Sequence, residues 1–317
     1  MSGLEANNVV LSILIVNFNG KRFLTDCLRS IEEFTSCSHE VIIVDNASSD
    51  GSAEFIAQNF PNVRLIQSKK NLGFTGGNNL GADAAKGRIL LLLNNDTVIL
   101  KDLKTAIDEL DNSTVGVVGA HLYYGDGRNQ PSVGYEHTPW RLILSWLGMS
   151  AITWLPSIFR RTESSEDFYA SPKANVAWVS GAFLLTRLAL WRQLGGLDDR
   201  YFMYVEDVDY CKRARQSGYS ISYLSDMKVT HYEGGGKSWL GEAALLRSMR
   251  SYLIYLRKFH TPFAASLTST SLGLVMLARA ASYALQGGSK KSHVTGEKMR
   301  AYFKAGRYLI ANPAIER

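Results

Sequence analysis

The chain of 317 residues is 46% hydrophobic and 20% charged, which excludes wholesale disorder and allows a full α/β core. Its formal net charge is +6, and the positive charge is concentrated after Gly234, where the sequence has thirteen basic residues and only three acidic ones. Such a segment favours anionic lipid or phosphate as a partner, whereas no basic cluster alternates with aromatic residues in a pattern that binds nucleic acid, so no nucleic-acid partner is expected.

The first half of the chain alternates apolar runs with helical patterns. Residues 1–8 are polar, so no secretory signal is expected. After them the sequence predicts strands at 9–17, 41–44, 63–67, 89–93 and 115–120, and helices near 24–34, 53–59, 78–85 and 103–110. Strands that alternate with helices are typical of βαβ units. We therefore expect an α/β fold with a Rossmann-like, mixed but mostly parallel sheet flanked by helices.

The second half is less regular. The sequence predicts a turn at 125–127, an apolar stretch at 141–159 that a proline interrupts, a strand region at 176–185, a helix near 188–194 and an ordered segment at 201–216. Cys27, Cys37 and Cys211 have no metal-type spacing, and a reduced, cytoplasmic compartment suits them best.

Residues 259–278 contain no Asp, Glu, Lys or Arg and are long enough for a membrane span. Six hydroxyl residues and a glycine make a span a poor fit, so we expect an interfacial helix flanked by Arg257, Lys258 and Arg279. A helix packed on the rest of the protein is an equal alternative. The expected domains are 1–240, with halves at about 9–122 and 123–240, and a basic, apolar helical C-terminal extension at 241–317.

Residues 88–98 carry the strongest functional signal. An apolar run typical of a buried strand ends abruptly in Asn94, Asn95 and Asp96. Ligands of open α/β sheets bind outside the carboxyl ends of the strands, where an aspartate can hold a divalent metal against a phosphate. The alternative is an Asn/Asp-rich turn that closes the strand.

Two other segments are polar in a similar way. Asp45 directly follows the strand at 41–44, where its carboxylate could accept the imide N–H of uracil or thymine, although a turn capped by Asp50 or Ser52 explains part of the segment. Residues 71–79 are predicted to form a glycine- and amide-rich loop before a helix, so that backbone N–H groups can approach a phosphate or ribose. Their glycine spacing is not the dinucleotide-binding fingerprint.

Ionisable side chains gather at two later positions. Glu206, Asp207 and Asp209 lie in the first turn of a predicted helix. Acids there favour the helix dipole, but one of them can also act as a general base toward a hydroxyl. His231 precedes a glycine-rich loop, so it is either a structural histidine or a metal ligand, with residues 237–238 touching phosphate as the loop closes.

In their order, these segments resemble the family 2 glycosyltransferases with the GT-A fold, and especially the rhamnosyltransferase branch. The resemblance covers about residues 9–260. It is carried by LIVNFNG (14–20), VDNASSDG (44–51), NLGF (71–74), GNN (77–79), LNNDT (93–97), WVSGA (178–182), GGLD (195–198) and FMYVEDVD (202–209).

The resemblance implies an inverting transfer of a sugar from a nucleotide-diphosphate donor to a hydroxyl. It implies Asp207 as the catalytic base with Glu206 beside it, and it places Trp178, Ser180 and Gly181 on the acceptor side. The residues expected to contact the nucleotide-sugar are Asn17, Asp45, Asn71, Gly73, Asn78, Asn95 and Asp96.

The resemblance also implies that Asp96 and His231 bind Mg²⁺ or Mn²⁺ at the diphosphate. Many family members have an aspartate where this chain has Asn94, so the site loses one charge. Because Mg²⁺ often needs only one or two carboxylates besides substrate phosphates, binding is still expected, but it should be weak without the nucleotide. Residues 9–122 would form the nucleotide-sugar half and residues 123–240 the acceptor half.

The expected donor is dTDP-rhamnose, with UDP-sugars as the alternative, and the expected acceptor is a saccharide or polyprenyl-linked saccharide in cell-surface polysaccharide synthesis. The apolar stretch at 141–159 and the basic C-terminal part predict peripheral contact with the inner face of the cell membrane. A non-catalytic nucleotide-sugar or glycan-binding module on the same fold is the alternative function, but it would need no acceptor carboxylates. A nucleotidyltransferase would require a basic glycine-rich loop after the first strand, which is absent from residues 17–21.

Overall fold

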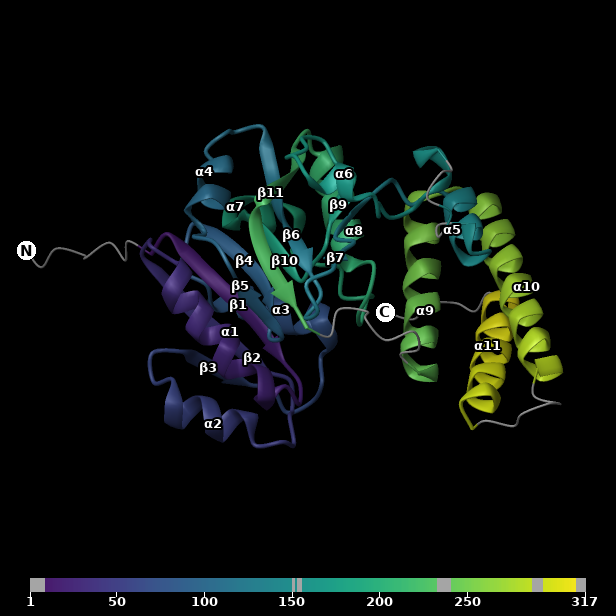
Figure 1. Ribbon diagram of the computed structural model, residues 1–317, viewed down its shortest axis with the longest axis horizontal. Coiled ribbons are helices and arrows are strands. Elements are labelled where there is room, and N and C mark those ends of the chain that lie inside the picture. The colour runs from purple at the N-terminus through teal and green to yellow at the C-terminus, as the bar shows by residue number, and fades with distance from the viewer. Residues whose placement is uncertain (1–8, 150–151, 153–155, 233–240, 287–292, 312–317) are drawn as a thin grey trace, which may run out of the picture. The chain divides into compact units, whose positions relative to one another are not determined.

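The computed structural model describes residues 9–149, 152, 156–232, 241–286 and 293–311 (Figure 1). The chain divides into two compact units. The sheet unit comprises Met1–Gly134, Ser164–Asp198 and Asp207–Gly236, and the helical unit comprises Tyr135–Glu163, Asp199–Glu206 and Lys237–Arg317. Two segments that the sequence analysis assigned to the acceptor half, 135–163 and 199–206, therefore group with the C-terminal helices.

The sheet unit contains a large mixed sheet and a separate two-stranded sheet (Figure 1). The strands of the large sheet are β1 Leu11–Asn17, β2 His39–Asp45, β3 Arg64–Gln67, β4 Ile89–Asn94, β5 Thr97–Ile99, β6 Val115–Tyr123, β7 Asn129–Gln130, β10 Phe183–Arg187 and β11 Ser220–His231. Their order is β3-β2-β1-β4-β10-β6-β11-β5, with β7 paired to β6. Strands β1 to β4, β6 and β11 run in one direction, and β5, β7 and β10 run in the other. The expected mixed, mostly parallel sheet is confirmed.

Seven helices of the described chain accompany these strands. They are α1 Lys21–Phe34, α2 Ser52–Asn59, α3 Gly73–Ala84, α4 Lys104–Glu109, α6 Glu166–Tyr169, α7 Leu188–Leu194 and α8 Glu206–Gln216. The separate two-stranded sheet pairs β8 (Val133–Gly134) with β9 (Trp178–Val179) in antiparallel orientation.

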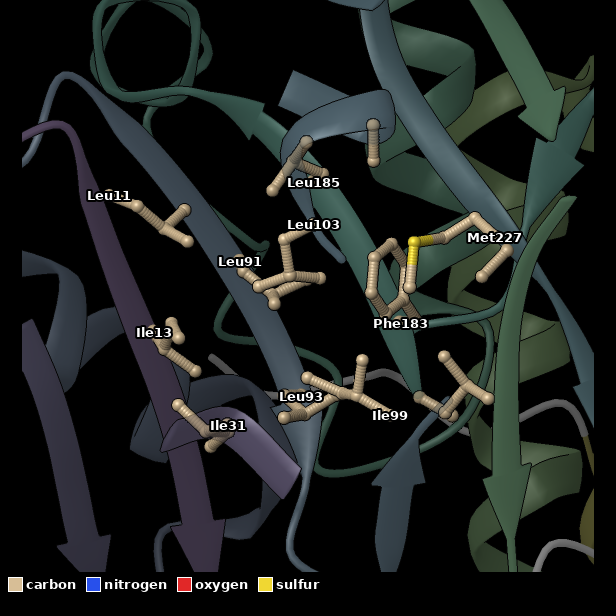
Figure 2. Packing of buried hydrophobic residues seen from close by; sticks show 14 of the residues in the cluster. Leu11, Ile13, Ile31, Leu91, Leu93, Ile99, Leu103, Phe183, Leu185 and Met227 are labelled. Carbon is tan, nitrogen blue, oxygen red and sulfur yellow. The ribbon is translucent and has the colours of Figure 1, made fainter. Parts of the chain in front are cut away.

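Strand β1 is buried on both faces because its side chains alternate between two layers. Ile13 and Ile15 join a core with Ile31 of α1 and Leu93 of β4, and Figure 2 shows Ile13, Ile31 and Leu93 within it. Val16, which follows Ile15, points to the other face of the strand and lies against Gly77 of α3. Helices on both faces of a parallel sheet are what the continuous apolar strands predict.

The prediction of a glycine-rich loop at 71–79 is wrong for most of that segment, because α3 begins at Gly73. Gly77 serves helix–sheet packing. A Cβ atom at Gly77 would lie 2.7 Å from Cγ1 of Val16, so only a glycine lets α3 lie this close to β1. Gly73 has φ +74°, a left-handed conformation that favours glycine where the helix starts.

The helical unit contains α5 Pro139–Trp146, the short 3₁₀ helix η2 Ser157–Phe159, α9 Glu242–Phe259, α10 Pro262–Gln286 and α11 His293–Ala311. Helix α10 packs against α11 and α5 (Figure 1). It extends eight residues beyond the apolar segment noted at 259–278. Among the described residues, Pro262–Leu285 is the one helical stretch that is long and apolar enough, by length and composition alone, to cross a membrane.

Candidate active site

Asn17, at the carboxyl end of β1, links three polar segments. Its Nδ2 donates to Oδ1 of Asp45 over 3.1 Å and to Oγ of Ser48 over 3.2 Å, and its Oδ1 accepts from Nδ2 of Asn95 over 2.7 Å. Asn17 is fully buried. The carboxyl ends of β1 and β2 and the turn after β4 are therefore joined by one side chain, at the sheet edge where ligands bind.

The turn between β1 and α1 packs tightly on this amide network. Asn19 has φ +53°, and its Oδ1 accepts from the Ser49 backbone N–H over 2.7 Å. A Cβ atom at Gly20 would lie 2.0 Å from Nδ2 of Asn95, so this position has room only for glycine. The next residue of the turn, Lys21, donates its backbone N–H to Asp50 over 2.9 Å.

Asp50 is held in its ionised form by this turn. Burial raises the pKa of its carboxyl group, but hydrogen bonds from the Ser52 hydroxyl and from the N–H groups of Lys21 and Ser52 outweigh burial, and the pKa lies below its ordinary value. Beside it is an open hollow of about 720 Å³ lined by Asn19, Lys21, Arg22, Thr25, Asp50 and Phe55. A negative charge thus lies at one side of an otherwise basic hollow.

Asp45, the predicted nucleobase contact, is 3% exposed and already accepts two hydrogen bonds. Its Oδ1 accepts from Asn17, and its Oδ2 accepts from the Ser48 backbone N–H over 3.0 Å. The next residue, Asn46, ties the strand end to α3, since its Nδ2 donates to the Gly73 carbonyl over 2.8 Å. Each carboxylate oxygen can accept more than one hydrogen bond, so a nucleobase contact at Asp45 stays a prediction.

The two predicted metal ligands lie side by side. Oδ1 of Asp96 is 3.2 Å from Nε2 of His231, and both residues are 8% exposed. The imidazole is contacted at both nitrogens, because Nδ2 of Asn94 is 3.0 Å from Nε2 and Nε2 of Gln130 is 3.2 Å from Nδ1. The strands β4, β7 and β11 bring these residues together from distant parts of the sequence.

The donor set of this pair fits a hard divalent cation that is shared with a ligand. Among the described residues, no group of three or more His, Cys, Asp or Glu side chains could hold a metal ion. Asp96 supplies a carboxylate oxygen and His231 an imidazole nitrogen, while phosphate oxygens and water would complete the coordination. For Nε2 to bind a metal, Nδ1 must carry the proton. Gln130 suits that tautomer, since a carboxamide can turn its oxygen toward the ring.

Asp207, the predicted base, is held by backbone N–H groups. Its Oδ2 accepts from the Gly181 N–H over 2.9 Å and its Oδ1 from the Val208 N–H over 2.8 Å. Gly181 lies close to both Asp207 and Phe74, because a Cβ atom there would be 3.5 Å from Cβ of Asp207 and 3.2 Å from the Phe74 ring. The loop before β10 therefore fixes the direction of the carboxylate.

The other acids of α8 differ from Asp207 in their surroundings. Asp209 is fully buried and pairs with Arg213, whose Nε lies 2.5 Å from its Oδ1. Arg213 also donates to the carbonyls of Leu194 and Gly196 over 2.6 and 2.8 Å. This pair ties α8 to the end of α7, so Asp209 has a structural role. Glu206, the first residue of α8, is 5% exposed.

The predicted acceptor residues lie on β9 and in the loop that follows. Trp178 is 8% exposed and pairs with Gly134 across the two-stranded sheet. The Ser180 backbone N–H donates to the Ser132 carbonyl over 2.8 Å. The Ala182 carbonyl accepts from the N–H of Asn94 over 3.1 Å. One main-chain bond therefore joins this loop to the turn that carries Asp96.

The chain enters α8 through an unusual backbone. Tyr204 and Val205 have φ angles of +72° and +71°. A left-handed conformation at a β-branched residue is a genuine outlier, and each such residue costs on the order of 1–3 kcal/mol. Conformational strain is thus stored immediately before Glu206 and Asp207.

Three of the predicted nucleotide contacts, Asn71, Gly73 and Asn78, form hydrogen bonds within their own segment. Oδ1 of Asn71 accepts from the Gly73 N–H over 2.9 Å, and Nδ2 of Asn78 donates to the Phe74 carbonyl over 2.9 Å. Asn78 is 1% exposed. Their contact with a nucleotide-sugar stays a prediction. The proposed phosphate contacts Lys237 and Ser238 lie outside the described residues.

Sequence reasoning missed several residues that hold the site together. Gln130 contacts the imidazole of His231, and Phe74 lies against Gly181. Nothing in the sequence around Gln130 marks it, whereas Phe74 belongs to the NLGF segment (71–74), which did not indicate its contact with Gly181. Ser48 and Asn19 could have been found, because both belong to the polar segments that the motifs include.

A family model described as "Glycosyl transferase family 2" matches residues 12–173, slightly more than half of the chain. The chain belongs to glycosyltransferase family 2. The match includes all of the predicted nucleotide-sugar contacts, and it ends before Asp207 and His231.

Relatives of this family 2 chain include named rhamnosyltransferases. The N-acetylglucosaminyl-diphospho-decaprenol L-rhamnosyltransferase of Mycobacterium tuberculosis is 28% identical over 273 residues, which cover 80% of this chain and 85% of that protein. The rhamnosyltransferase WbbL of Escherichia coli is 24% identical and covers 69% of this chain and 82% of its own length. The resemblance to the rhamnosyltransferase branch is confirmed, and the chain is a glycosyltransferase.

Solved structures support the fold. The mannosyltransferase PcManGT from Pyrobaculum calidifontis, solved in complex with GDP-Man and Mn²⁺, matches with a TM-score of 0.56 at 16% identity and covers 96% of this chain and 86% of its own. TarS 1–349 of Staphylococcus aureus matches with a TM-score of 0.52 at 16% identity and covers 95% of this chain and 81% of its own. The GT-A fold of this family 2 glycosyltransferase is confirmed.

Proposed function

We propose that this family 2 glycosyltransferase moves a sugar, with dTDP-rhamnose favoured as the donor, to a hydroxyl of a saccharide or polyprenyl-linked saccharide in cell-surface polysaccharide synthesis. The observation that supports the proposal is that the predicted metal ligands and the predicted base all lie in the sheet unit, each fixed by contacts with its neighbours. Asp96 and His231 pair at one side, and Asp207 is oriented by Gly181. The named rhamnosyltransferase relatives support the donor, and the decaprenol in one of their names supports a lipid-linked acceptor.

In the proposed reaction the acceptor hydroxyl attacks the anomeric carbon of the donor sugar in one displacement. The new glycosidic bond forms as the bond to the diphosphate breaks, and the nucleoside diphosphate leaves. Asp207 takes the proton of the attacking hydroxyl, and a positioned base of this kind contributes ~10²–10⁴-fold. The backbone N–H groups of Gly181 and Val208 keep its two oxygens in place.

Asp96 and His231 would hold Mg²⁺ or Mn²⁺, which supplies positive charge beside the departing diphosphate. Asn94, Asn95 and Asn17 would position the same turn through neutral amides. The set has one carboxylate among its described protein ligands, so the phosphate oxygens must supply most of the negative charge that attracts the cation. Metal binding is therefore proposed to depend on the nucleotide.

The base assignment is tested by Asp207→Asn. The amide oxygen of the variant can keep one of the two backbone hydrogen bonds that hold Asp207, so the fold is expected to survive with some loss of stability, whereas proton transfer is lost. We expect transfer to fall by about 10²–10⁴-fold with unchanged donor binding. Asp226→Asn changes an exposed aspartate of β11 in the same unit and serves as the matched control. Full activity in Asp207→Asn would move the base to Glu206.

The substrate class is tested with a panel of labelled nucleotide-sugars, each with and without Mg²⁺ or Mn²⁺. Sugar release to a saccharide acceptor or to water supports transfer, and the donor with the highest turnover identifies the sugar. A preference for UDP-sugars over dTDP-rhamnose would overturn the donor assignment. Binding without turnover of any donor would favour the non-catalytic module.

A lipid-linked acceptor implies that the protein acts at a membrane. We infer that the protein acts in the cytoplasm at the inner face of the cell membrane, as a peripheral protein. The proposal is supported by the charge distribution, since thirteen basic residues and three acidic ones follow Gly234. Fractionation of cells that express the protein tests it, and recovery of all activity in the soluble fraction at low salt would contradict it.

A further inference from the structure

Helix α10 of the helical unit has an exposed apolar face. Phe263, Leu267, Leu274 and Leu285 are 77%, 57%, 58% and 85% exposed. Their spacings of 4, 7 and 11 residues place them on one stripe of an α-helix. With a rise of ~1.5 Å per residue, the stripe is about 33 Å long. Single exposed leucines are ordinary, but an aligned apolar stripe marks an interaction surface.

Two of the six hydroxyl residues that made this segment a poor membrane helix, Thr268 and Ser269, are buried within the helical unit, whereas Ser266 is exposed beside the stripe. Thr268 and Ser269 are 2% and 0% exposed. Oγ1 of Thr268 donates to the Ala264 carbonyl over 2.7 Å, and Oγ of Ser269 donates to the Leu309 carbonyl of α11 over 2.7 Å. The interior of the helical unit therefore satisfies the hydroxyls of Thr268 and Ser269, while the stripe itself consists of apolar side chains.

The one charged residue of α10 is also turned toward its own unit. Nε and Nη2 of Arg279 donate to the Trp146 carbonyl at the end of α5 over 3.1 and 2.6 Å. Beside this contact lies an open apolar hollow of about 560 Å³, lined by Trp146, Leu147, Leu274, Val275, Ala278, Arg279 and Ser282. Leu147 is 56% exposed. The apolar surface of α10 thus continues onto the end of α5.

The charge of this part of the chain indicates what covers the stripe. With thirteen basic and three acidic residues, the segment after Gly234 has a formal charge of +10, whereas the rest of the chain has −4. On α11, Arg300 and Arg307 are exposed and flank Phe303, which is 49% exposed. An apolar stripe on a strongly basic unit is typical of helices that lie in the surface of an anionic bilayer.

We propose that the outward face of α10, together with Leu147, binds the surface of an anionic lipid bilayer with the helix lying in the interface. The inference deepens the proposed function and rests on it for the lipid-linked acceptor, which such a bilayer would present. The stripe gives the area that enters the acyl boundary, and the basic side chains give attraction to the headgroups. The hydroxyls buried in the unit remain satisfied when the helix lies flat.

The test uses the full chain and vesicles of phosphatidylglycerol and phosphatidylcholine, compared with vesicles of phosphatidylcholine alone. We expect co-sedimentation with the anionic vesicles that weakens as NaCl is raised. The double variant Leu267→Asp/Leu274→Asp should weaken this binding at least tenfold. Leu100→Asp, at a 41% exposed leucine of the sheet unit, is the control and should bind as the unchanged protein does.

Both leucines of the double variant are exposed, so unfolding temperatures close to that of the unchanged protein are expected and verify the fold. Unchanged vesicle binding in the double variant overturns the proposal. The proposal is also overturned if high salt at alkaline pH does not extract the protein from the vesicles, because α10 would then span the bilayer. A dimer that the double variant dissociates, without vesicle binding, assigns the face to a second copy and also overturns it.

The vesicle assay needs no donor or acceptor, which separates this proposal from the proposed function. Transfer to a soluble saccharide with no vesicle binding overturns the lipid surface alone. Vesicle binding by the unchanged chain with no turnover of any nucleotide-sugar overturns the proposed transfer and leaves the surface supported.

Discussion

Gly20→Ala tests whether the amide network at the carboxyl ends of β1 and β4 is the donor site. Gly20 is buried and has φ −111° and ψ 18°, so the backbone accepts alanine. The new methyl group would lie 2.0 Å from Nδ2 of Asn95, 3.0 Å from its Cγ and 2.8 Å from Oδ1 of Asn17. Because these distances are far below van der Waals contact, the side chain of Asn95 must move.

The expected cost follows from two terms. Moving Asn95 breaks its 2.7 Å hydrogen bond to Asn17, which is worth about 0.5–1.5 kcal/mol, and overpacking of this kind costs about 1–3 kcal/mol. We expect the free energy of unfolding to fall by about 1–3 kcal/mol in urea titrations. If Asn95 contacts the donor, a loss of ~1.4 kcal/mol in binding raises the dissociation constant of the nucleotide about tenfold.

Gly296→Ala is the matched control, because a Cβ atom there meets nothing within 4 Å. Asn95→Ala removes the atom that clashes, so the double variant Gly20→Ala/Asn95→Ala should regain part of the stability lost in Gly20→Ala. The double-mutant cycle therefore has a non-zero coupling energy. Nucleotide affinity of Gly20→Ala equal to that of the unchanged protein, measured by calorimetry, would refute the placement of the donor at this network.

Three further predictions concern metal, packing and thiols. His231→Ala should abolish the increase in nucleotide affinity that Mg²⁺ or Mn²⁺ gives. EDTA should abolish the same increase in the unchanged protein. An increase that persists in His231→Ala contradicts the metal site. Gly77→Ala should cost about 1–3 kcal/mol in urea unfolding, whereas at Gly81 a Cβ atom makes ordinary contacts of 3.4 Å or more, so Gly81→Ala should be neutral or stabilising. Equal stability of the two variants would show that α3 does not need its glycine at 77. Burial raises the pKa of Cys27 and of Cys211 to about 12, so at pH 8 Ellman's reagent should label at most the third thiol until urea unfolds the chain.

The strand pattern and the polar residues that end the strands were predictable from local sequence. Val9–Asn17 was predicted as a strand, and β1 spans Leu11–Asn17 because uninterrupted apolar residues suit burial on both faces. The pair of Asp96 and His231 is 135 residues apart, yet both follow or end strands, so the edge of the sheet brings them together.

The rest depended on contacts that local sequence does not show. The glycines at 73–77 are compatible with a phosphate-binding loop and with a closely packed helix, and only the distance to Val16 separates the two. Gln130 lies on the two-residue strand β7, and nothing around it in the sequence indicates that it faces His231. Strand β10 is antiparallel to both of its neighbours, which a pattern of alternating strands and helices does not predict.

The insertion of β10 between β4 and β6 has an evolutionary consequence. Its loop accepts a main-chain hydrogen bond at Ala182 from Asn94 and donates one at Gly181 to Asp207. The three-residue loop at 180–182 thus connects the turn that carries Asp96 with Asp207, the two positions at which we propose that donor and acceptor bind. A substitution in this loop that changes the preferred acceptor is expected to affect Asn94 and Asp207 as well, since residues in contact show non-additive effects. New acceptor specificity in this lineage is therefore expected to arise through paired changes on both sides of the loop.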